Sequence, residues 1–310
     1  MPAELLVPPW QAEEAAYVSA VLAILLALTL AAVAAAALLG TGGAPPRTLF
    51  ARWFSWSVLA PVFALAAFGG PLTVAILMTV LSLQGLREWG RLTGLPANHR
   101  FLLATYAIIA GALALSGSVA LLATIPILLL VSTLQPILSA DVRQGMRNLS
   151  FGALGFAYLP LLLAHGTLLV RDLEHGAAIL FATGAATALS DIGAYAVGKA
   201  FGRHPLAPTI SPNKTLEGTV GNLLGALAGW SLFLPILPGI APHVVVALAL
   251  IVGVGAIWGD LFKSVLKREF GVKDAGTLLP GFGGILDRID SLIMSVPLVY
   301  YALLVGGIAR

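Results

Sequence analysis

Long apolar segments separated by short charged loops are the feature that most constrains this chain. Segments of about 20 residues, the length of helix that crosses a bilayer, recur along the 310 residues, and the sequence is 59% hydrophobic and 10% charged. Ordinary soluble domains carry roughly 25% charged residues, so this chain cannot cover a water-exposed surface. A soluble enzyme, a secreted disulfide scaffold, a nucleic-acid binder and a disordered chain are therefore excluded. The sequence predicts an all-α, polytopic integral membrane protein with about ten transmembrane helices.

The apolar segments define the predicted helices and their connections. Gly69, Gly70 and Pro71 divide one long apolar block, and Ser116 with Gly117 divides another. Each block is therefore predicted to form a tight helical hairpin. The ten predicted spans are 15–40, 52–69, 71–87, 101–116, 117–134, 150–170, 176–198, 217–236, 243–262 and 290–307.

The first apolar segment differs from a cleavable signal peptide. It is preceded by Glu4, Glu13 and Glu14 without any Lys or Arg, and its apolar stretch is longer than the central region of a signal peptide. We therefore interpret residues 1–45 as an additional N-terminal transmembrane anchor, followed by the main membrane domain over residues 46–310.

The distribution of positive charge predicts the orientation. With the N-terminus outside and ten spans, fifteen of the 17 Lys and Arg residues fall in inner segments, and only Arg171 and Arg310 fall in outer ones. Cytoplasmic loops of membrane proteins carry the excess of Lys and Arg. The sequence therefore predicts that the N-terminus lies outside and that the charged loops face the cytoplasm.

Two of the inner loops carry most of the polar side chains. The first extends from Ser190 to Gly218 and the second from Gly259 to Asp290. A carboxylate at membrane depth is costly unless it is paired, so a single one is equally well explained by a buried ion pair. Five of them, together with about eight basic residues on one side of the membrane, favour a functional site. These carboxylates are Asp191, Glu217, Asp260, Asp287 and Asp290.

The residue types and their spacing indicate a phosphate-and-metal site. Hard oxygen ligands without any cysteine or a histidine cluster suit Mg²⁺, and interleaved Lys and Arg suit phosphate oxygens. Asp287 and Asp290 share one face if the last helix begins there, and glycines within 281–284 let backbone N–H groups approach an anion. Asp260, Lys263, Ser264 and Lys267 are also spaced so that they lie along one face of a helix, and we call them the stripe.

These loops also carry an extended motif. It is formed by Ser264, Lys267, Arg268, Lys273, Asp274, Pro280, Gly281, Gly283, Gly284, Asp287, Arg288 and Asp290. In type and spacing it resembles the signature of the phosphatidate cytidylyltransferases, also called CDP-diacylglycerol synthases. The segments from Ser190 to Tyr195 and from Ser211 to Gly218, and the pair Glu88-Trp89, are also similar to that family. The resemblance covers about residues 46–310.

The resemblance implies that residues 46–310 form a cytidylyltransferase-like membrane domain. Such a domain would transfer CMP from CTP to a membrane lipid phosphate, phosphatidate or a close relative, giving CDP-diacylglycerol and pyrophosphate for phospholipid biosynthesis. The expected location is the bacterial inner membrane, with the active site facing the cytoplasm. The expected partners are CTP, the lipid phosphate, the bilayer and a second copy of the chain in a homodimer, but no nucleic acid.

The same resemblance assigns roles to individual residues. The cofactor is Mg²⁺ or Mn²⁺, bound by Asp260, Asp287 and Asp290, with Asp191 and Glu217 as weaker ligands. The residues expected to hold the phosphates are Lys214, Lys267, Arg268 and Arg288. The catalytic residues are Asp260, Lys267, Arg268, Asp287, Arg288 and Asp290. The substrate-binding residues are Ser190, Asp191, Lys214, Thr215, Glu217, Ser264, Lys273, Asp274, Gly283 and Gly284.

One departure from the family signature and two alternative functions remain. The histidine between the family's glycines is Phe282 here. Because phenylalanine can neither donate a hydrogen bond nor bind a metal, we expect slower turnover or a preference for another lipid phosphate. A CTP-dependent lipid kinase of the dolichol kinase type would instead transfer the γ-phosphoryl group. A transporter is disfavoured because its site usually lies near the bilayer midplane, whereas these charges gather at one side.

Overall fold

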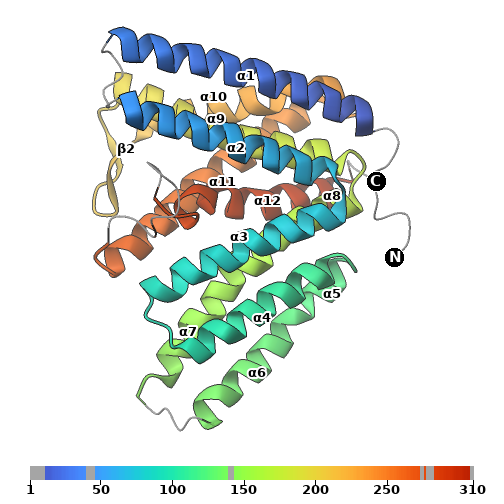
Figure 1. Ribbon diagram of the computed structural model, residues 1–310, viewed down its shortest axis with the longest axis vertical. Helices are drawn as coiled ribbons and strands as arrows, with labels where there is room; N and C mark the ends of the chain where they lie inside the picture. The colour runs from blue at the N-terminus through green and yellow to red at the C-terminus, as the bar shows by residue number, and fades with distance from the viewer. Residues whose placement is uncertain (1–10, 40–45, 139–142, 273–275, 277–282, 308–310) are drawn as a thin grey trace.

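The protein is a bundle of long helices with one short β-hairpin (Figure 1). The computed structural model describes residues 11–39, 46–138, 143–272, 276 and 283–307. The first six α-helices are α1 (Gln11–Leu39), α2 (Pro46–Phe68), α3 (Pro71–Leu92), α4 (Ala97–Ala114), α5 (Ser118–Leu122) and α6 (Thr124–Leu138). The others are α7 (Gly145–Phe156), α8 (Leu162–Asp172), α9 (Gly176–Phe201), α10 (Leu216–Leu232), α11 (Pro242–Glu269) and α12 (Leu286–Gly306).

Each of the ten predicted apolar segments is helical in the part of the chain that the structure describes. The segment 117–134 comprises α5 and α6, and the segment 150–170 comprises α7, a π-helical turn over Ala157–Leu161, and α8. Seven helical stretches are long and apolar enough to cross a membrane, namely Ala12–Leu38, Thr48–Phe68, Ser118–Leu138, Gly145–Asp172, Gly176–Phe201, Pro242–Glu269 and Leu286–Gly306. The count of ten spans stays a prediction, because α3 and α4 carry charged ends and α10 has 17 residues.

Tight turns form both predicted helical hairpins. Gly70 has a φ of 95° between α2 and α3, and Gly117 has a φ of 117° between α4 and α5. Residues other than glycine rarely adopt such positive φ angles. Pro71 begins α3, and its fixed φ is suited to the first turn of a helix. The glycines that interrupt the apolar blocks therefore reverse the chain direction, as predicted.

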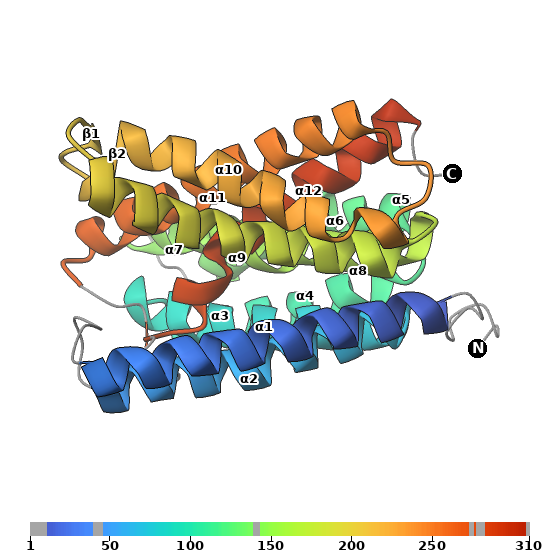
Figure 2. The same ribbon diagram turned by 90° about the horizontal axis from the view of Figure 1, so that it is seen from above.

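Small residues bring the central helices into close contact. Gly221, Gly225 and Gly229 on α10 pack against backbone atoms of α9, so that a methyl group at any of these positions would collide with the neighbouring helix. Such approaches are typical of helices in lipid, where packing replaces the hydrophobic driving force. The helices α9, α10, α11 and α12 thereby form one compact group (Figure 2).

The fold is not purely helical, which corrects the predicted class at one point. After α9, the chain forms an antiparallel hairpin of β1 (Pro205–Ala207) and β2 (Ser211–Thr215), which leads directly into α10. Pro205, Pro208 and Pro212, three prolines within eight residues, disfavour a continuous helix here. Figure 1 shows this hairpin at the same end of the bundle as the end of α11 and the start of α12.

The first helix is attached to the rest of the bundle by polar contacts in its N-terminal part and at its middle. The Tyr17 hydroxyl donates to the Leu232 carbonyl at 2.8 Å, and the Trp53 indole donates to the Leu26 carbonyl at 3.1 Å. Glu14, which is buried, contacts His175 at the start of α9. Helix α1 therefore packs along α2, and its N-terminal part reaches the start of α9, at the opposite end of that helix from the β-hairpin.

Candidate active site

The candidate active site is organised by the crossing of α11 and α12. A methyl group at Gly259 would collide with the Asp290 carbonyl oxygen, so the two backbones touch at this point. Ser291 and Ser295 on α12 direct their hydroxyls at the Ala256 and Val252 carbonyls of α11, each at 3.4 Å. This close approach places the acidic first turns of α12 directly against the basic stripe of α11.

Lys263 lies at the centre of the polar cluster. Its side chain is 9% exposed, and its ammonium lies 2.9 Å from Asp260 Oδ1 and 2.6 Å from Asp290 Oδ2. It also donates to the Asp287 backbone carbonyl at 3.3 Å. Asp290 is buried, and Lys263 is the cation that its Oδ2 contacts among the described residues. One ammonium therefore compensates two carboxylates from different helices.

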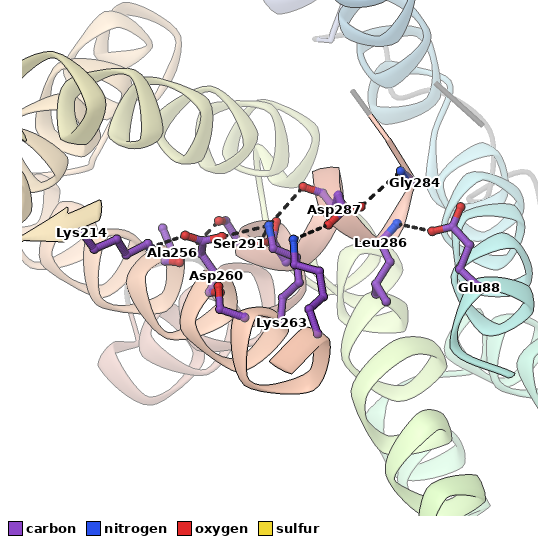
Figure 3. A network of polar contacts seen from close by, with 12 residues as sticks. Glu88, Lys214, Ala256, Asp260, Lys263, Gly284, Leu286, Asp287 and Ser291 are labelled. Atoms are coloured by element: carbon purple, nitrogen blue, oxygen red, sulfur yellow. Dashed lines mark hydrogen bonds and ion pairs between the residues drawn. The ribbon is translucent and has the colours of Figure 1, made fainter. Parts of the chain in front are cut away.

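Two further lysines complete the charge pairing. Lys214 on β2 contacts Asp260 Oδ2, and Lys267 on α11 donates to Asp287 Oδ1 at 3.0 Å. Asp260 remains 28% exposed, so its carboxylate is accessible from the end of the bundle. Asp191 on α9 interacts electrostatically with the same cluster. Figure 3 shows the contacts running from Lys214 through Asp260 and Lys263 to Asp287.

Glu88 on α3 fixes the start of α12. Its side chain is buried, and its two carboxylate oxygens accept the backbone N–H groups of Ile285 at 3.0 Å and Leu286 at 2.9 Å. The first N–H groups of a helix have no partner within the helix, and a carboxylate there is stabilised by the helix dipole. Asp287 adds a local contact by accepting the Gly284 N–H at 3.2 Å. The position of the acidic turns of α12 therefore depends on α3.

The remaining predicted residues on α11 and α12 have defined surroundings. The Ser264 hydroxyl donates to the Asp260 carbonyl one turn earlier at 2.7 Å, and the Arg268 Nε donates to the Ile210 carbonyl in the β-hairpin at 3.3 Å. Arg288 is exposed next to the buried Asp287. Gly283 has a φ of 84°, the left-handed conformation that glycine permits. Lys273, Asp274 and Phe282 lie outside the residues that the structure describes.

Apart from Lys214 and Asp191, the predicted residues of the first loop make hydrogen bonds within their own part of the chain and do not contact the Asp260 cluster in the described structure. The Ser190 hydroxyl is buried and donates to the Thr187 carbonyl at 2.7 Å. Thr215 caps α10 by accepting the Gly218 N–H at 3.1 Å. Glu217 accepts the Arg203 N–H at 3.0 Å and contacts His204 Nδ1 at 2.6 Å. The structure thus gives these side chains contacts within α9, the hairpin and α10, and brings Lys214 and Asp191 to the Asp260 cluster.

The chemistry of the cluster suits a hard divalent cation. Within the described ranges no three His, Cys, Asp or Glu side chains are close enough to hold a metal ion together. Mg²⁺, however, is usually bound by one or two carboxylates together with water and substrate phosphates. Asp260 and Asp290 share the Lys263 ammonium at the crossing of α11 and α12. These two carboxylates therefore lie close enough to act as such a pair, whereas Asp287 accepts from Lys267 and from the Gly284 N–H.

Comparisons with known proteins identify the family. A model of the cytidylyltransferase family matches residues 50–305. The chain belongs to the cytidylyltransferase family. Within it, the chain is 39% identical over 138 residues to a phosphatidate cytidylyltransferase of Mycobacterium bovis and 40% identical over 136 residues to one of Bacillus subtilis. A third phosphatidate cytidylyltransferase, from Synechocystis, is 47% identical over 119 residues.

These similarities cover only part of each protein. The aligned segments span 44%, 43% and 36% of this chain and 45%, 51% and 38% of the Mycobacterium, Bacillus and Synechocystis relatives. The chain therefore matches about half the length, or less, of these relatives. The family-model match is longer and extends from α2 into α12, so it includes every described residue of the Lys214–Asp290 cluster.

The sequence does not predict the role of two residues that the structure makes central in this member of the cytidylyltransferase family. Lys263 was placed on the stripe with Asp260, where its spacing indicated a shared face but gave no contact with α12. Glu88 was recognised as part of a pair similar to the family, although it lies about 200 residues from its partners in α12. A glutamate at the polar end of an apolar helix was the available signal, since such a buried carboxylate requires donors.

Proposed function

We propose that this protein transfers CMP from CTP to the phosphate of a membrane lipid, phosphatidate or a close relative. The lipid phosphate oxygen attacks the α-phosphorus of CTP, the bond from that phosphorus to the bridging oxygen of the β-phosphate breaks, and pyrophosphate leaves. The products are CDP-diacylglycerol and pyrophosphate. The observation that carries this proposal is the cluster in which Lys214, Lys263 and Lys267 pair with Asp260, Asp287 and Asp290 at one end of the bundle.

The lysines of this cluster are suited to bind a triphosphate. A lysine ammonium is a compact charge that binds phosphate oxygens, and a triphosphate with several negative charges competes with a single carboxylate for it. Lys214 and Lys267 are each partly exposed and each contact one carboxylate. Exchange of these contacts for phosphate oxygens would hold CTP at the end of the bundle and free Asp260 at the same time.

The carboxylates and the helix crossing supply the rest of the mechanism. Asp260 and Asp290 would hold Mg²⁺, which when bound neutralises charge on the phosphates and on the departing pyrophosphate. Lys263 keeps the two carboxylates together before substrate arrives. Because phosphoryl-type transfer depends mainly on positioning and on charge neutralisation, the backbone contact between α11 and α12 and the bond of Glu88 to α12 serve to fix the reacting groups.

The proposed topology agrees with this chemistry. Ten spans with the N-terminus outside would place the hairpin end of the bundle at the cytoplasmic face of a bacterial inner membrane. Fifteen of the 17 Lys and Arg residues then lie on the inner side, as the distribution of charge in membrane proteins requires. CTP is supplied on that side, and the lipid phosphate lies at the depth of the Asp260 carboxylate. A homodimer is compatible with this arrangement.

Product analysis with purified protein tests the proposal. The protein is incubated with Mg²⁺, a panel of lipid phosphates, and CTP labelled either at the α-phosphate or at the γ-phosphate. The α-label is expected in the lipid fraction as a CDP-lipid, and the γ-label in pyrophosphate. A γ-labelled lipid together with CDP would instead identify a lipid kinase, and the absence of any turnover with lipid phosphates would refute the proposal.

A further inference from the structure

Three arginines converge on a cavity between α3 and α4. The cavity has a volume of about 260 Å³, and its lining includes Arg87 and Arg91 from α3 and Arg100 from α4. Arg87 and Arg91 are one helical turn apart and therefore point from the same face of α3. All three side chains are exposed. The cavity is therefore strongly positive.

The local packing directs Arg100 toward α3. A methyl group at Gly90 would lie 2.7 Å from Arg100 Cδ and 2.8 Å from Cγ, so the aliphatic part of Arg100 rests on this glycine. The absence of a side chain at Gly90 lets the guanidinium of α4 lie across α3, beside those of Arg87 and Arg91. The cluster is thus a consequence of how the two helices pack, in addition to the general excess of positive charge at this end.

Among the described residues, the charges in this cavity have no protein counterion. Within the described ranges, none of the three guanidiniums contacts a carboxylate or another hydrogen-bond acceptor. By contrast, Arg147, at the same end of the bundle, donates to the Thr93 carbonyl at 3.0 Å and lies over the Phe151 ring. Three neighbouring like charges repel one another, and the nearby start of α4 adds the positive end of a helix dipole without a side-chain cap. An anion would relieve this repulsion.

The apolar part of the lining indicates where the anion comes from. Leu83, Leu86 and Ala104 line the same cavity and continue toward the apolar lengths of α3 and α4. A ligand with a phosphate at one end and hydrocarbon at the other matches both parts. Arginine also pairs with phosphate oxygens through two parallel hydrogen bonds.

We propose that the cavity lined by Arg87, Arg91 and Arg100 binds the phosphate of an anionic membrane lipid. This site is separate from the Asp260 cluster, because Glu88 on α3 turns toward α12 whereas Arg87 and Arg91 turn toward α4. Figure 1 shows α3 lying between these two helices. The lipid held here would lie on the other side of α3 from the candidate active site and would not be the group that reacts.

Binding of phosphatidylglycerol to the full chain in detergent, without CTP, tests this proposal. Phosphatidylglycerol carries a phosphate diester and therefore cannot act as the acceptor in the proposed reaction, so the result is independent of the proposed function. Bound lipid is counted by native mass spectrometry. The unmodified chain is expected to bind phosphatidylglycerol in preference to zwitterionic phosphatidylcholine, and Arg91→Gln is expected to weaken this binding about tenfold.

The combined variant Arg87→Gln, Arg91→Gln and Arg100→Gln is expected to remove the preference. The matched control is Arg143→Gln, which removes an exposed arginine from the same end of the bundle but outside the cavity. The single Arg91→Gln variant decides the test if the combined variant does not fold. Unchanged binding in the arginine variants or equal binding of phosphatidylcholine would overturn the proposal. Displacement of the lipid by an equal concentration of inorganic phosphate would overturn the assignment to a lipid.

Discussion

The bond between Glu88 and α12 gives a quantitative prediction for Glu88→Gln. The carboxylate accepts two backbone N–H groups, from Ile285 and Leu286, at 3.0 and 2.9 Å. Glutamine has the same shape but presents one acceptor oxygen, and its NH₂ group would face the second N–H donor. A hydrogen bond to a charged group contributes about 1.5–3 kcal/mol. Loss of one such bond therefore lowers the equilibrium constant for correct seating of α12 by about 10- to 150-fold, and the correctly seated population by up to that factor.

Because Asp287 and Asp290 follow directly after these N–H groups, we expect kcat for CDP-lipid formation to fall by the same factor. The concentration of Mg²⁺ needed for half-maximal activity should rise at the same time, which a general loss of stability would not produce. Gln84→Ala is the matched control, since it removes the 3.1 Å bond from Gln84 Nε2 to Glu88 and leaves both bonds to α12. A folded Glu88→Gln protein with unchanged kcat and Mg²⁺ dependence would refute the reasoning.

Four further predictions concern the cluster and the helices around it. Activity should disappear with EDTA and return with Mg²⁺ or Mn²⁺. The variant Asp290→Asn should lower kcat at least about a hundredfold, and full activity in that variant would remove Asp290 from the site. Lys263→Met leaves Asp290 buried beside no ammonium, so the free energy of unfolding in mixed micelles should fall by about 3–5 kcal/mol, and an unchanged value would contradict the pairing. Gly259→Leu should lower the melting temperature strongly because α11 and α12 touch there, whereas Val254→Leu on the exposed face of α11 should not. Deletion of residues 1–45 should reduce the yield of folded protein but preserve activity per folded molecule, and a folded, inactive truncation would place α1 in the site.

Local patterns were sufficient to predict the helices of this protein. Apolar runs gave all ten helical segments, and the glycines near positions 70 and 117 gave both hairpins. The predicted helix ends were less accurate: the last helix begins at Leu286, four residues before the predicted position, and places Asp287 inside its first turn. Hydropathy alone underestimates the length of such a helix, because its first residues are polar although their backbone is already helical. The β-hairpin was not predicted because strands of three and five residues, each with a proline, carry little strand signal.

The grouping of acidic and basic residues at one membrane side was also predictable, but the pairs within it were not. The spacing of Asp260, Lys263 and Lys267 indicates a common face of one helix, and nothing in that spacing specifies a partner. Lys263 could have paired within α11 alone. Its contact with Asp290 exists because Gly259 lets the backbone of α12 approach, and that approach is a property of two helices rather than of either sequence segment.

The sequence by itself determined that this chain is a helical membrane protein with a charged, cytidylyltransferase-like end, because hydrophobicity and charge act locally along the chain. The tertiary structure decided which carboxylate meets which lysine, that Glu88 holds the start of α12 across about 200 residues of chain, and that Arg100 crosses α3 at Gly90. These contacts depend on the distances between helices, and small residues set those distances through close packing. The residue types of the site can therefore be predicted from local sequence, whereas their distances and pairing depend on contacts between helices that are far apart in the chain.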